Sequence, residues 1–313
     1  MVEQENNRET KLSNKTLFLY LLFFFIIITS LDINFKHRGL SIAAAENDYC
    51  EPWLSSIALA SLNDTQNTIN SLLFFDQEDH SYRAITEFFR VNNLEELIWM
   101  HAVNNQSLLN EAVTNCAHLL EIDLIQGRIA HDANDNSDIN IESILTIIEN
   151  TRQGIKLDFK DIFSLEPILN TLENSHYSGP LIINMDLIPG PGNNRRLNED
   201  QIEAFIEQAN RFPNSILSLS WFTSNHIRRS YTPEMIDEMI SLVYEHQLDS
   251  HPITFPINLH HFLGSEESLT RLLNEFSNSS LTLFLSRPND NNVEEIAEII
   301  TKAPFLGRVM RDY

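Results

Sequence analysis

Four short segments between residues 99 and 160 decide the fold: WMHAVNN at 99–105, LEIDL at 120–124, IAHD at 129–132 and GIKLDFK at 154–160. The first, second and fourth lie in or at the end of short apolar runs, which are typical of buried β-strands. IAHD lies just beyond the second run. Helix-length segments separate these three strands, as in alternating α/β structures. Carboxylate, ammonium and imidazole groups at the ends of three such consecutive strands predict one functional site.

The same alternation of strands and helices continues to the end of the sequence. Apolar runs of strand length occur at 97–103, 118–125, 154–159, 180–188, 215–222, 252–259, 280–286 and 307–312. Amphipathic segments between them predict helices at 106–115, 141–152, 163–174, 198–211, 232–246, 265–277 and 292–302. This alternation indicates βαβ units and a parallel sheet. Eight such units favour a closed α/β structure, the (β/α)8 TIM barrel, and no Gly-x-Gly-x-x-Gly turn follows the first strand.

The sequence divides into an N-terminal polar segment at 1–45, a helical extension at 46–93 and the barrel domain at 94–313. We expect the extension to pack on the barrel, over the wall that an eighth helix would otherwise cover. The apolar run LFLYLLFFFIIITSL at 17–31 is 15 residues long. A spanning helix needs about 20 residues and a signal sequence about 7–15 apolar ones, so this run predicts an export signal or a short membrane anchor. Either would place the barrel outside the cytosol, secreted or attached to a membrane.

Composition excludes some partners, but it does not decide whether the two cysteines form a disulfide. The formal net charge is −23. Such an acidic protein is repelled by phosphate backbones, so we expect no nucleic-acid partner, and charge alone does not favour binding to anionic lipid. Cys50 and Cys116 are the two cysteines. An exported protein could join them in a disulfide, but two buried thiols are an equally good interpretation.

Polar side chains follow the predicted strands at their carboxyl ends, where barrels of this class carry their reacting groups. They are His101 and Asn104 on the first strand, Glu121 and Asp123 on the second, Lys156, Asp158 and Lys160 on the third, Asn184 and Asp186 on the fourth, and Trp221 on the fifth. Side chains two residues apart on a strand share a face. We therefore expect one mouth of the barrel to collect them.

Glu121, Asp123 and Asp158 are the candidate metal ligands. Packed together without a cation, the three carboxylates would repel one another and raise one another's pKa. Mg²⁺ or Ca²⁺ would remove that penalty, because these hard cations prefer oxygen ligands. Zinc fits less well, because two histidines with carboxylates are a less specific signal for it. The alternative interpretation is that the acids form ion pairs with Lys156 and Lys160.

His101 and His131 are the candidate catalytic residues. One imidazole could attack phosphorus or activate the nucleophile, while the other protonates the leaving oxygen. The alternative is that both are ordinary structural histidines. Lys160 could hold a phosphate oxygen, and Asn104 could bind the metal or the phosphate.

Weaker signals extend the predicted substrate-binding site. Lys156 shares a strand face with Lys160, and Asn184 and Asp186 could contact the substrate or a water molecule next to it. Trp221 could stack on a head group or shield the mouth. The pairs at 195–196 (Arg-Arg) and 260–261 (His-His) are more simply interpreted as solvated surface.

Together these segments resemble the menorin-like domain, a family related to the phospholipase-C-like phosphodiesterase barrels. The resemblance covers residues 94–313, and its further marks are LIINMDLIPGPG at 181–192, LSLSWFT at 217–223, YTPEMIDEMI at 231–240 and HPITFPI at 251–257. The wider superfamily includes glycerophosphodiester phosphodiesterases and the phospholipase D toxins of spider venom. Resemblance to those enzymes implies catalysis by His101 and His131 and metal binding by Glu121, Asp123 and Asp158.

The chain also departs from the superfamily pattern. Ala-Val-Asn follows His101, where glycerophosphodiesterases usually have Arg-Gly, and Asp158 stands where their third acid is commonly Glu. Ser220 occupies a position where glycine is expected. These differences argue against glycerophosphodiester substrates while leaving the acid–base and metal residues in place.

Two functions from different classes follow. The first is a phosphodiesterase, or a lyase that forms a cyclic phosphate, which uses Mg²⁺ or Ca²⁺ and acts on a phospholipid head group or a similar phosphodiester. The second is an exported or cell-surface barrel that has lost catalysis and binds a partner protein.

Overall fold

The computed structural model describes residues 80–149, 151–224, 226, 228–285 and 293–312. The predicted export signal or anchor at 17–31, most of the helical extension and Cys50 lie outside the described residues. Among the residues that are described, no helix is both long enough and apolar enough to cross a bilayer. Cys116 is disulfide-bonded, which agrees with the first of the two interpretations given for the cysteines.

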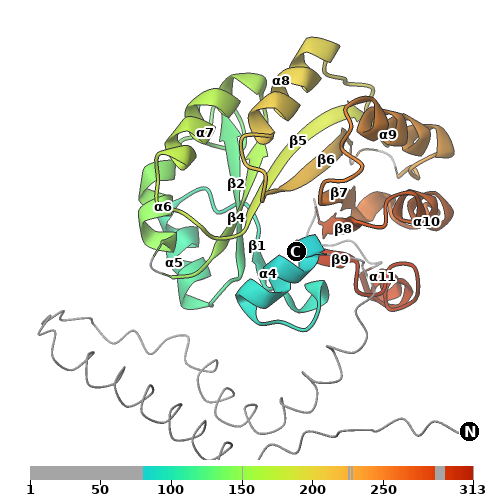
Figure 1. Ribbon diagram of the computed structural model, residues 1–313, viewed down its shortest axis with the longest axis horizontal. Helices are drawn as coiled ribbons and strands as arrows, with labels where there is room; N and C mark the ends of the chain where they lie inside the picture. The colour runs from blue at the N-terminus through green and yellow to red at the C-terminus, as the bar shows by residue number, and fades with distance from the viewer. Residues whose placement is uncertain (1–79, 150, 225, 227, 286–292, 313) are drawn as a thin grey trace, which may run out of the picture. The chain divides into compact units, whose positions relative to one another are not determined.

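The described chain forms an eight-stranded parallel barrel, as the alternation predicts (Figure 1). Its strands follow one another in the order β1 (Trp99–Met100), β2 (Leu119–Ile125), β4 (Gly154–Phe159), β5 (Leu181–Pro189), β6 (Ile216–Phe222), β7 (Ile253–Asn258), β8 (Ser279–Phe284) and β9 (Val309–Asp312). A short strand, β3 (Arg128–Ile129), pairs antiparallel with the end of β2. The last strand returns to the first, because His101, directly after β1, contacts Asp312 at the end of β9.

Helices lie between successive strands and surround the sheet (Figure 1). They are α5 (Gln106–Thr114), α6 (Ile141–Ile148), α7 (Leu165–Glu173), α8 (Glu199–Ala209), α9 (Pro233–Glu245), α10 (Glu266–Glu275) and α11 (Val293–Ile300), with short 3-10 turns at η2 (Leu94–Glu96), η3 (Ile162–Ser164) and η4 (Leu259–His261). Four of the helices begin where a side chain accepts a hydrogen bond from the backbone of the first turn: Asn105, Asn140, Asn198 and Thr232. These caps satisfy donors that the helix itself cannot, which fixes the starting residue.

The strands bury both faces, but the two faces differ in chemistry. On β2, Leu120, Ile122 and Leu124 are fully buried in the large core that the strands share with the surrounding helices. Glu121 and Asp123 alternate with them and are buried as well. Since successive side chains of a strand point to opposite faces, these carboxylates point into the barrel. The interior is therefore polar toward the carboxyl ends of the strands.

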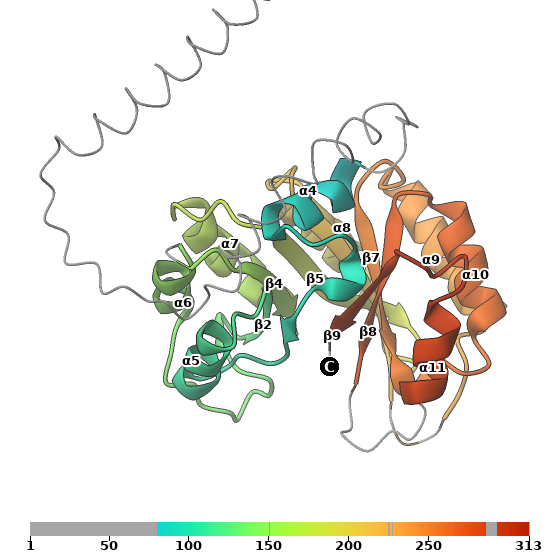
Figure 2. The same ribbon diagram turned by 90° about the horizontal axis from the view of Figure 1, so that it is seen from below.

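The helix α4 (His80–Phe89) is the described helix of the predicted extension. Residues 46–79 of the extension lie outside the described residues. The helix packs across the end of the barrel where the strands begin, not over the side wall (Figure 2). Its apolar residues form a second buried cluster with side chains from the starts of the strands: Tyr82, Ile85, Phe89, Trp99, Leu119, Ile182, Ile216 and Met310. The physical reason is that these strand-start side chains are apolar and need a cover, which one helix supplies.

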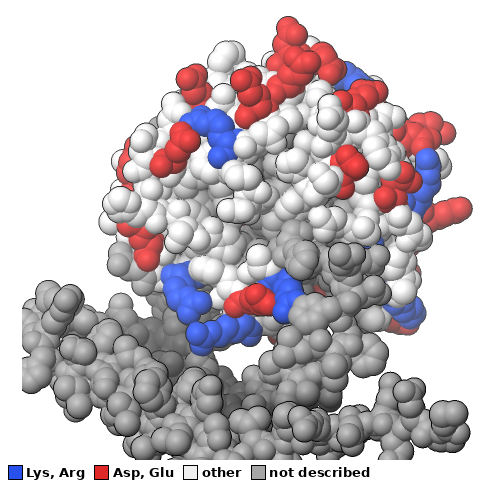
Figure 3. All heavy atoms as spheres, viewed as in Figure 1, with Lys and Arg blue, Asp and Glu red and all other residues white. Residues whose placement is uncertain are grey.

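Acidic side chains are spread over most of the face of the molecule seen in Figure 3. Figure 3 shows Asp and Glu spread over the helices on this face, while Lys and Arg gather in fewer places. This distribution agrees with the net charge of −23.

Candidate functional site

Strand register assembles the first part of the site. Asp123 on β2 lies opposite Asp158 on β4, which lies opposite Asn184 on β5, which in turn lies opposite Ser218 on β6. The Asn184 side chain donates to Asp158 Oδ1 at 2.7 Å and accepts from Ser218 Oγ at 2.6 Å. The four side chains therefore lie in one layer across the barrel, and hydrogen bonds join the last three of them.

Lys160 joins the two carboxylates of this layer. Its Nζ lies 2.8 Å from Asp123 Oδ1 and 2.7 Å from Asp158 Oδ2. The second oxygen of Asp123 accepts a 2.6 Å hydrogen bond from Asn104 Nδ2, and the Asp123 amide donates back to Asn104 Oδ1 at 3.0 Å. Burial lowers the pKa of Lys160, but the charges of Asp158 and Asp123 outweigh it and hold the pKa well above its ordinary value. Lys160 is thus a cation shared by both acids.

The second part of the site is centred on His101. Its Nδ1 contacts Glu121 Oε2 and lies 3.1 Å from Asp312 Oδ1. Lys156 Nζ completes the cluster, at 2.5 Å from Glu121 Oε1 and 3.5 Å from Asp312 Oδ2. The side chains of Glu121, Lys156 and Asp312 are at most 4% exposed, whereas that of His101 is 43% exposed. The imidazole therefore has one nitrogen fixed by buried carboxylates and an edge that reaches solvent.

Electrostatics of this cluster favour a charged imidazole. Burial lowers the pKa of His101, but the hydrogen bonds and charges of Asp312 and Glu121 raise it to about 10. Burial and the charge of Glu121 raise the pKa of Asp312, because two carboxylates share one small space. Lys156 has a raised pKa for the same electrostatic reason as Lys160.

The predicted metal ligands are divided between these two parts. Asp123 and Asp158 meet at Lys160, while Glu121 faces His101 and Lys156. Both lysine–carboxylate pairs of the alternative interpretation are therefore present. Of the described residues, two groups bring carboxylate and imidazole atoms within 4.8 Å of one another: His101 with Glu121 and Asp312, and His131 with Asp132 and Asp135.

The chemistry of these donors still fits a hard divalent cation. Lys160 Nζ shows that one positive charge can lie between Asp123 and Asp158. Burial and the charges of Asp158 and Glu121 raise the pKa of Asp123, even though Lys160 opposes the effect. Carboxylates thus outnumber the ammonium groups among them. Oxygen donors in excess of local positive charge suit Mg²⁺ or Ca²⁺ better than zinc.

His131 lies on the exposed loop after β3. Its side chain is 61% exposed, and its Nδ1 is 3.6 Å from Asp132 Oδ2. The loop is tied to the end of β2, because the Ala130 amide donates to the Asp123 carbonyl at 3.0 Å. His131 therefore belongs to the same end of the barrel as Asp123, without a described contact to the His101 cluster.

Asp186 and Trp221 differ in how they relate to the mouth. Asp186 lies two residues beyond Asn184 on the inner face of β5, where burial and the charge of Asp158 raise its pKa to about 6. Trp221 corrects a prediction, because its ring is buried between Tyr231 and Phe255 and its Nε1 donates to a backbone carbonyl of α9. Ser218 points inward on β6, so Trp221, three residues on, points outward toward the helices.

Asp312 and Ser218 are site residues that the sequence analysis missed. Asp312 ends the last apolar run, as Glu121 and Asp123 end theirs, so the same positional signal was available. Its contact with His101 spans 211 positions of sequence, however, and depends on the return of β9 to β1. Ser218 carries no charge and gives no comparable signal.

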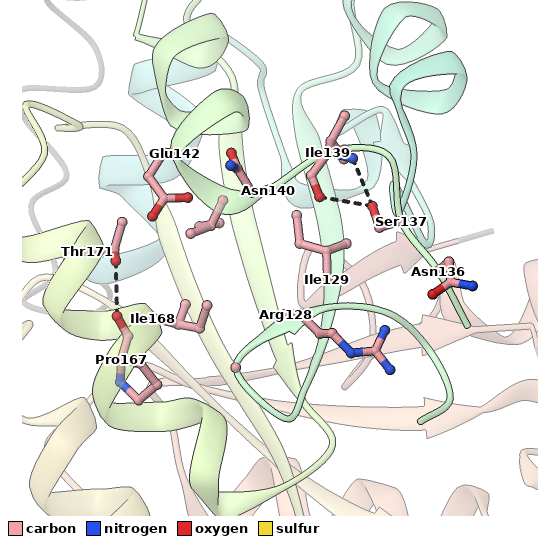
Figure 4. Close-up of a pocket in the computed structure, with 12 residues that line it drawn as sticks. Arg128, Ile129, Asn136, Ser137, Ile139, Asn140, Glu142, Pro167, Ile168 and Thr171 are labelled. Carbon is pink, nitrogen blue, oxygen red and sulfur yellow. Dashed lines mark hydrogen bonds between the residues drawn. The ribbon is translucent and has the colours of Figure 1, made fainter. Parts of the chain in front are cut away.

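A separate pocket lies away from these residues. It has a volume of about 340 Å³ and is formed by the turn between β2 and β3 and by the N-terminal parts of α6 and α7 (Figure 4). Figure 4 shows Glu142, Asn140 and Thr171 around it, with Arg128 at its edge. None of the predicted site residues lines this pocket, so it is not the mouth of the barrel.

Fold and site together define an α/β barrel with a buried carboxylate–lysine network and one partly exposed histidine at the carboxyl ends of its strands. The Menorin N-terminal domain family matches residues 93–309. Protein FAM151B of Homo sapiens is 32% identical over 219 residues, which are 65% of this chain and 78% of that protein. The chain belongs to the menorin family.

Proposed function

We propose that this protein is a phosphodiesterase, or a lyase that forms a cyclic phosphate, dependent on a divalent metal and acting on a phospholipid head group or a similar phosphodiester. The proposal includes a relation of its barrel to the phospholipase-C-like phosphodiesterases. The observation that carries it is the position of His101: Nδ1 faces two buried carboxylates, Glu121 and Asp312, while the side chain is 43% exposed at the mouth.

The arrangement supports proton transfer at His101. Carboxylates at Nδ1 fix the ring orientation and leave Nε2 as the nitrogen that can exchange a proton with a substrate oxygen. His131, on the loop beside β2, would serve the opposite side of the phosphorus and protonate the leaving oxygen or deprotonate the attacking one. Water and a hydroxyl of the substrate are both acceptable nucleophiles in this scheme, which is why hydrolysis and cyclisation are proposed together.

The charged residues would bind the phosphate and the metal. Mg²⁺ or Ca²⁺ would be held by Asp123 and Asp158 where Lys160 Nζ lies between them, and Glu121, which faces His101 and Lys156, would have to turn to reach it. The cation would neutralise charge that develops on the phosphate. Lys160, 27% exposed, can turn its ammonium from the acids toward a phosphate oxygen. Asn104 keeps Asp123 in place through two hydrogen bonds. Lys156 and Asp312 stay buried and hold Glu121 and His101.

Turnover by histidine variants tests this proposal. His101→Ala and His131→Ala should each abolish hydrolysis of bis(4-nitrophenyl) phosphate and of mixed phospholipid vesicles, without a change in thermal midpoint large enough to indicate unfolding. His176→Ala is the matched control, because His176 is exposed on the loop before β5, away from the strand ends that form the mouth. Retained activity in both site variants would rule out the assigned chemistry.

Metal binding has an independent readout. A cation that binds only the native state must raise the thermal midpoint. We expect millimolar Mg²⁺ or Ca²⁺ to raise it relative to EDTA, and the Asp158→Asn variant to lose the shift.

The proposed export follows from the apolar run at 17–31. Its test is whether the full chain expressed in a cell reaches the medium or the outer surface.

One observation favours the second candidate, an exported or cell-surface barrel that binds a partner protein without catalysis. Lys156 and Lys160 already pair with the carboxylates, so the network is stable without a metal. The absence of any midpoint shift in Mg²⁺ or Ca²⁺, together with the absence of turnover, would select this candidate.

A further inference from the structure

The loops at the mouth differ sharply in charge. Those after β5, β6 and β7 (190–198, 223–232 and 259–265) contain no Asp or Glu, but they contain four arginines and three histidines. The loop after β3 (130–140) contains three aspartates and no Lys or Arg. In a chain of net charge −23, such a basic sector has not arisen from a generally basic surface. It lies at the same end of the barrel as the site, because these loops follow the carboxyl ends of parallel strands.

Hydrogen bonds join the first two of these loops. The Ser224 amide donates to the Pro191 carbonyl at 3.0 Å. The Asn193 side chain donates to the Thr223 carbonyl at 3.3 Å. The loop after β5 is therefore held against the loop after β6.

A buried histidine joins the third loop to them. His261 is 0% exposed, and its ring nitrogens contact the Ser224 carbonyl at 3.1 Å and the Arg229 amide at 3.3 Å. The neutral ring satisfies both contacts, one as donor and one as acceptor. Burial and the nearby charges of His260 and Arg228 lower the pKa of His261, which agrees with a neutral ring. The three loops thus form one connected platform.

The platform presents arginines to solvent. The Arg195 guanidinium lies 4.6 Å from the centroid of the Phe222 ring, which holds it over the end of β6. The Arg229 side chain is exposed, while its backbone amide donates to His261 and holds the loop in place. Neither side chain has a carboxylate partner among the described residues. Arg196 differs, because it pairs with Glu238 on α9.

We propose that Arg195 and Arg229, with Arg228 and His260 beside them, bind an anionic group of the substrate other than the phosphodiester itself. This basic rim assigns a substrate class: a phosphodiester that carries a second phosphate, such as a phosphorylated head group. Arginine suits this role because its planar fork matches phosphate oxygens. The inference rests on the proposed function for the diester, but the anion site can be tested without turnover.

The first experiment measures binding of inorganic pyrophosphate to the full chain by titration calorimetry, in EDTA so that metal binding does not contribute. The double variant Arg195→Gln/Arg229→Gln should weaken binding by about tenfold or more, since charge-assisted contacts are lost. The matched control, Arg83→Gln, removes an exposed arginine from α4 at the other end of the barrel and should change nothing. Equal affinity in all three proteins would overturn the inference.

The second experiment compares turnover of two soluble phosphodiesters that contain no glycerol: inositol 1-(methyl phosphate) and the same diester with a second phosphate on the inositol 4-hydroxyl. The native chain should prefer the phosphorylated ester, and the double variant should lose that preference while keeping its rate on the unphosphorylated one. Presenting the same head group in phosphatidylcholine vesicles distinguishes a lipid from a soluble source of the anion. Failure to turn over either ester, with rim-dependent pyrophosphate binding intact, would overturn the proposed function and not the anion site.

Discussion

Replacement of Lys156 by methionine tests the buried network most directly. Lys156 Nζ lies 2.5 Å from Glu121 Oε1 and 3.5 Å from Asp312 Oδ2, and its side chain is 4% exposed. Methionine keeps most of the side-chain volume and removes the charge, so two buried carboxylates lose their ammonium partner. Breaking a buried ion pair in this way costs about 3–5 kcal/mol of unfolding free energy.

The measurement is urea unfolding at neutral pH in EDTA, analysed by linear extrapolation with the m-value compared between proteins. Lys302→Met is the matched control. Lys302 Nζ is 3.2 Å from Glu298 Oε1, but the two side chains are 66% and 78% exposed. An exposed pair of this kind contributes about 1 kcal/mol or less, because water screens it.

The reasoning fails if Lys156→Met loses no more stability than Lys302→Met. A double variant tests whether the unpaired charge causes the loss of stability. Adding Glu121→Gln to Lys156→Met removes the unpaired negative charge, so part of the lost free energy should return. If the double variant loses more unfolding free energy than the two single variants lose when added together, the lost packing of the lysine stem explains the result instead of charge.

Three further predictions concern single positions. Asp186→Asn should stabilise the fold by about 1–3 kcal/mol at pH 7.5 and have little effect at pH 4. The reason is that the folded-state pKa of Asp186 is raised to about 6, so its ionisation above that pH costs stability. Urea midpoints at both pH values check this. The free energy of unfolding should fall as the pH drops below about 6.5, where His118 is protonated in the unfolded state but resists protonation in the folded one. Burial lowers the pKa of His118, and its Nδ1 accepts a hydrogen bond from the Ile98 amide at 2.7 Å. A flatter pH profile for His118→Asn would confirm this, and an unchanged profile would contradict it. Trp221→Ala should cost about 3–5 kcal/mol as a core truncation, whereas a raised KM with an unchanged midpoint would restore the stacking role that the sequence suggested.

Local patterns predicted the strands well because apolar runs and polar breaks mark their ends. β4 occupies residues 154–159 as predicted, and the other strands differ by a few residues. The exception is β1, predicted at 97–103 and observed only at Trp99–Met100. The chain leaves the sheet there because Ala102 has a φ of 52°, a left-handed conformation that ends the extended backbone. No residue type at this position signals such a turn.

The site was predictable as far as its side chains alternate along single strands. Glu121, Asp123, Asp158 and Asn184 face inward as their spacing implies. The pairing of each carboxylate was not predictable, because it depends on which lysine from the neighbouring strand reaches which layer. The contact of His101 with Asp312 was harder still to predict, since it requires the first and last strands to meet.

The helix over the strand starts has a practical consequence for anyone who prepares this domain. The residues that match the family are 93–309, and both α4 and the last three residues of β9 lie beyond them. A chain trimmed to that match would expose Trp99 and Leu119 to water and would leave His101 with a single carboxylate neighbour. It would be expected to aggregate, and inactivity of such a fragment would say nothing about the intact protein.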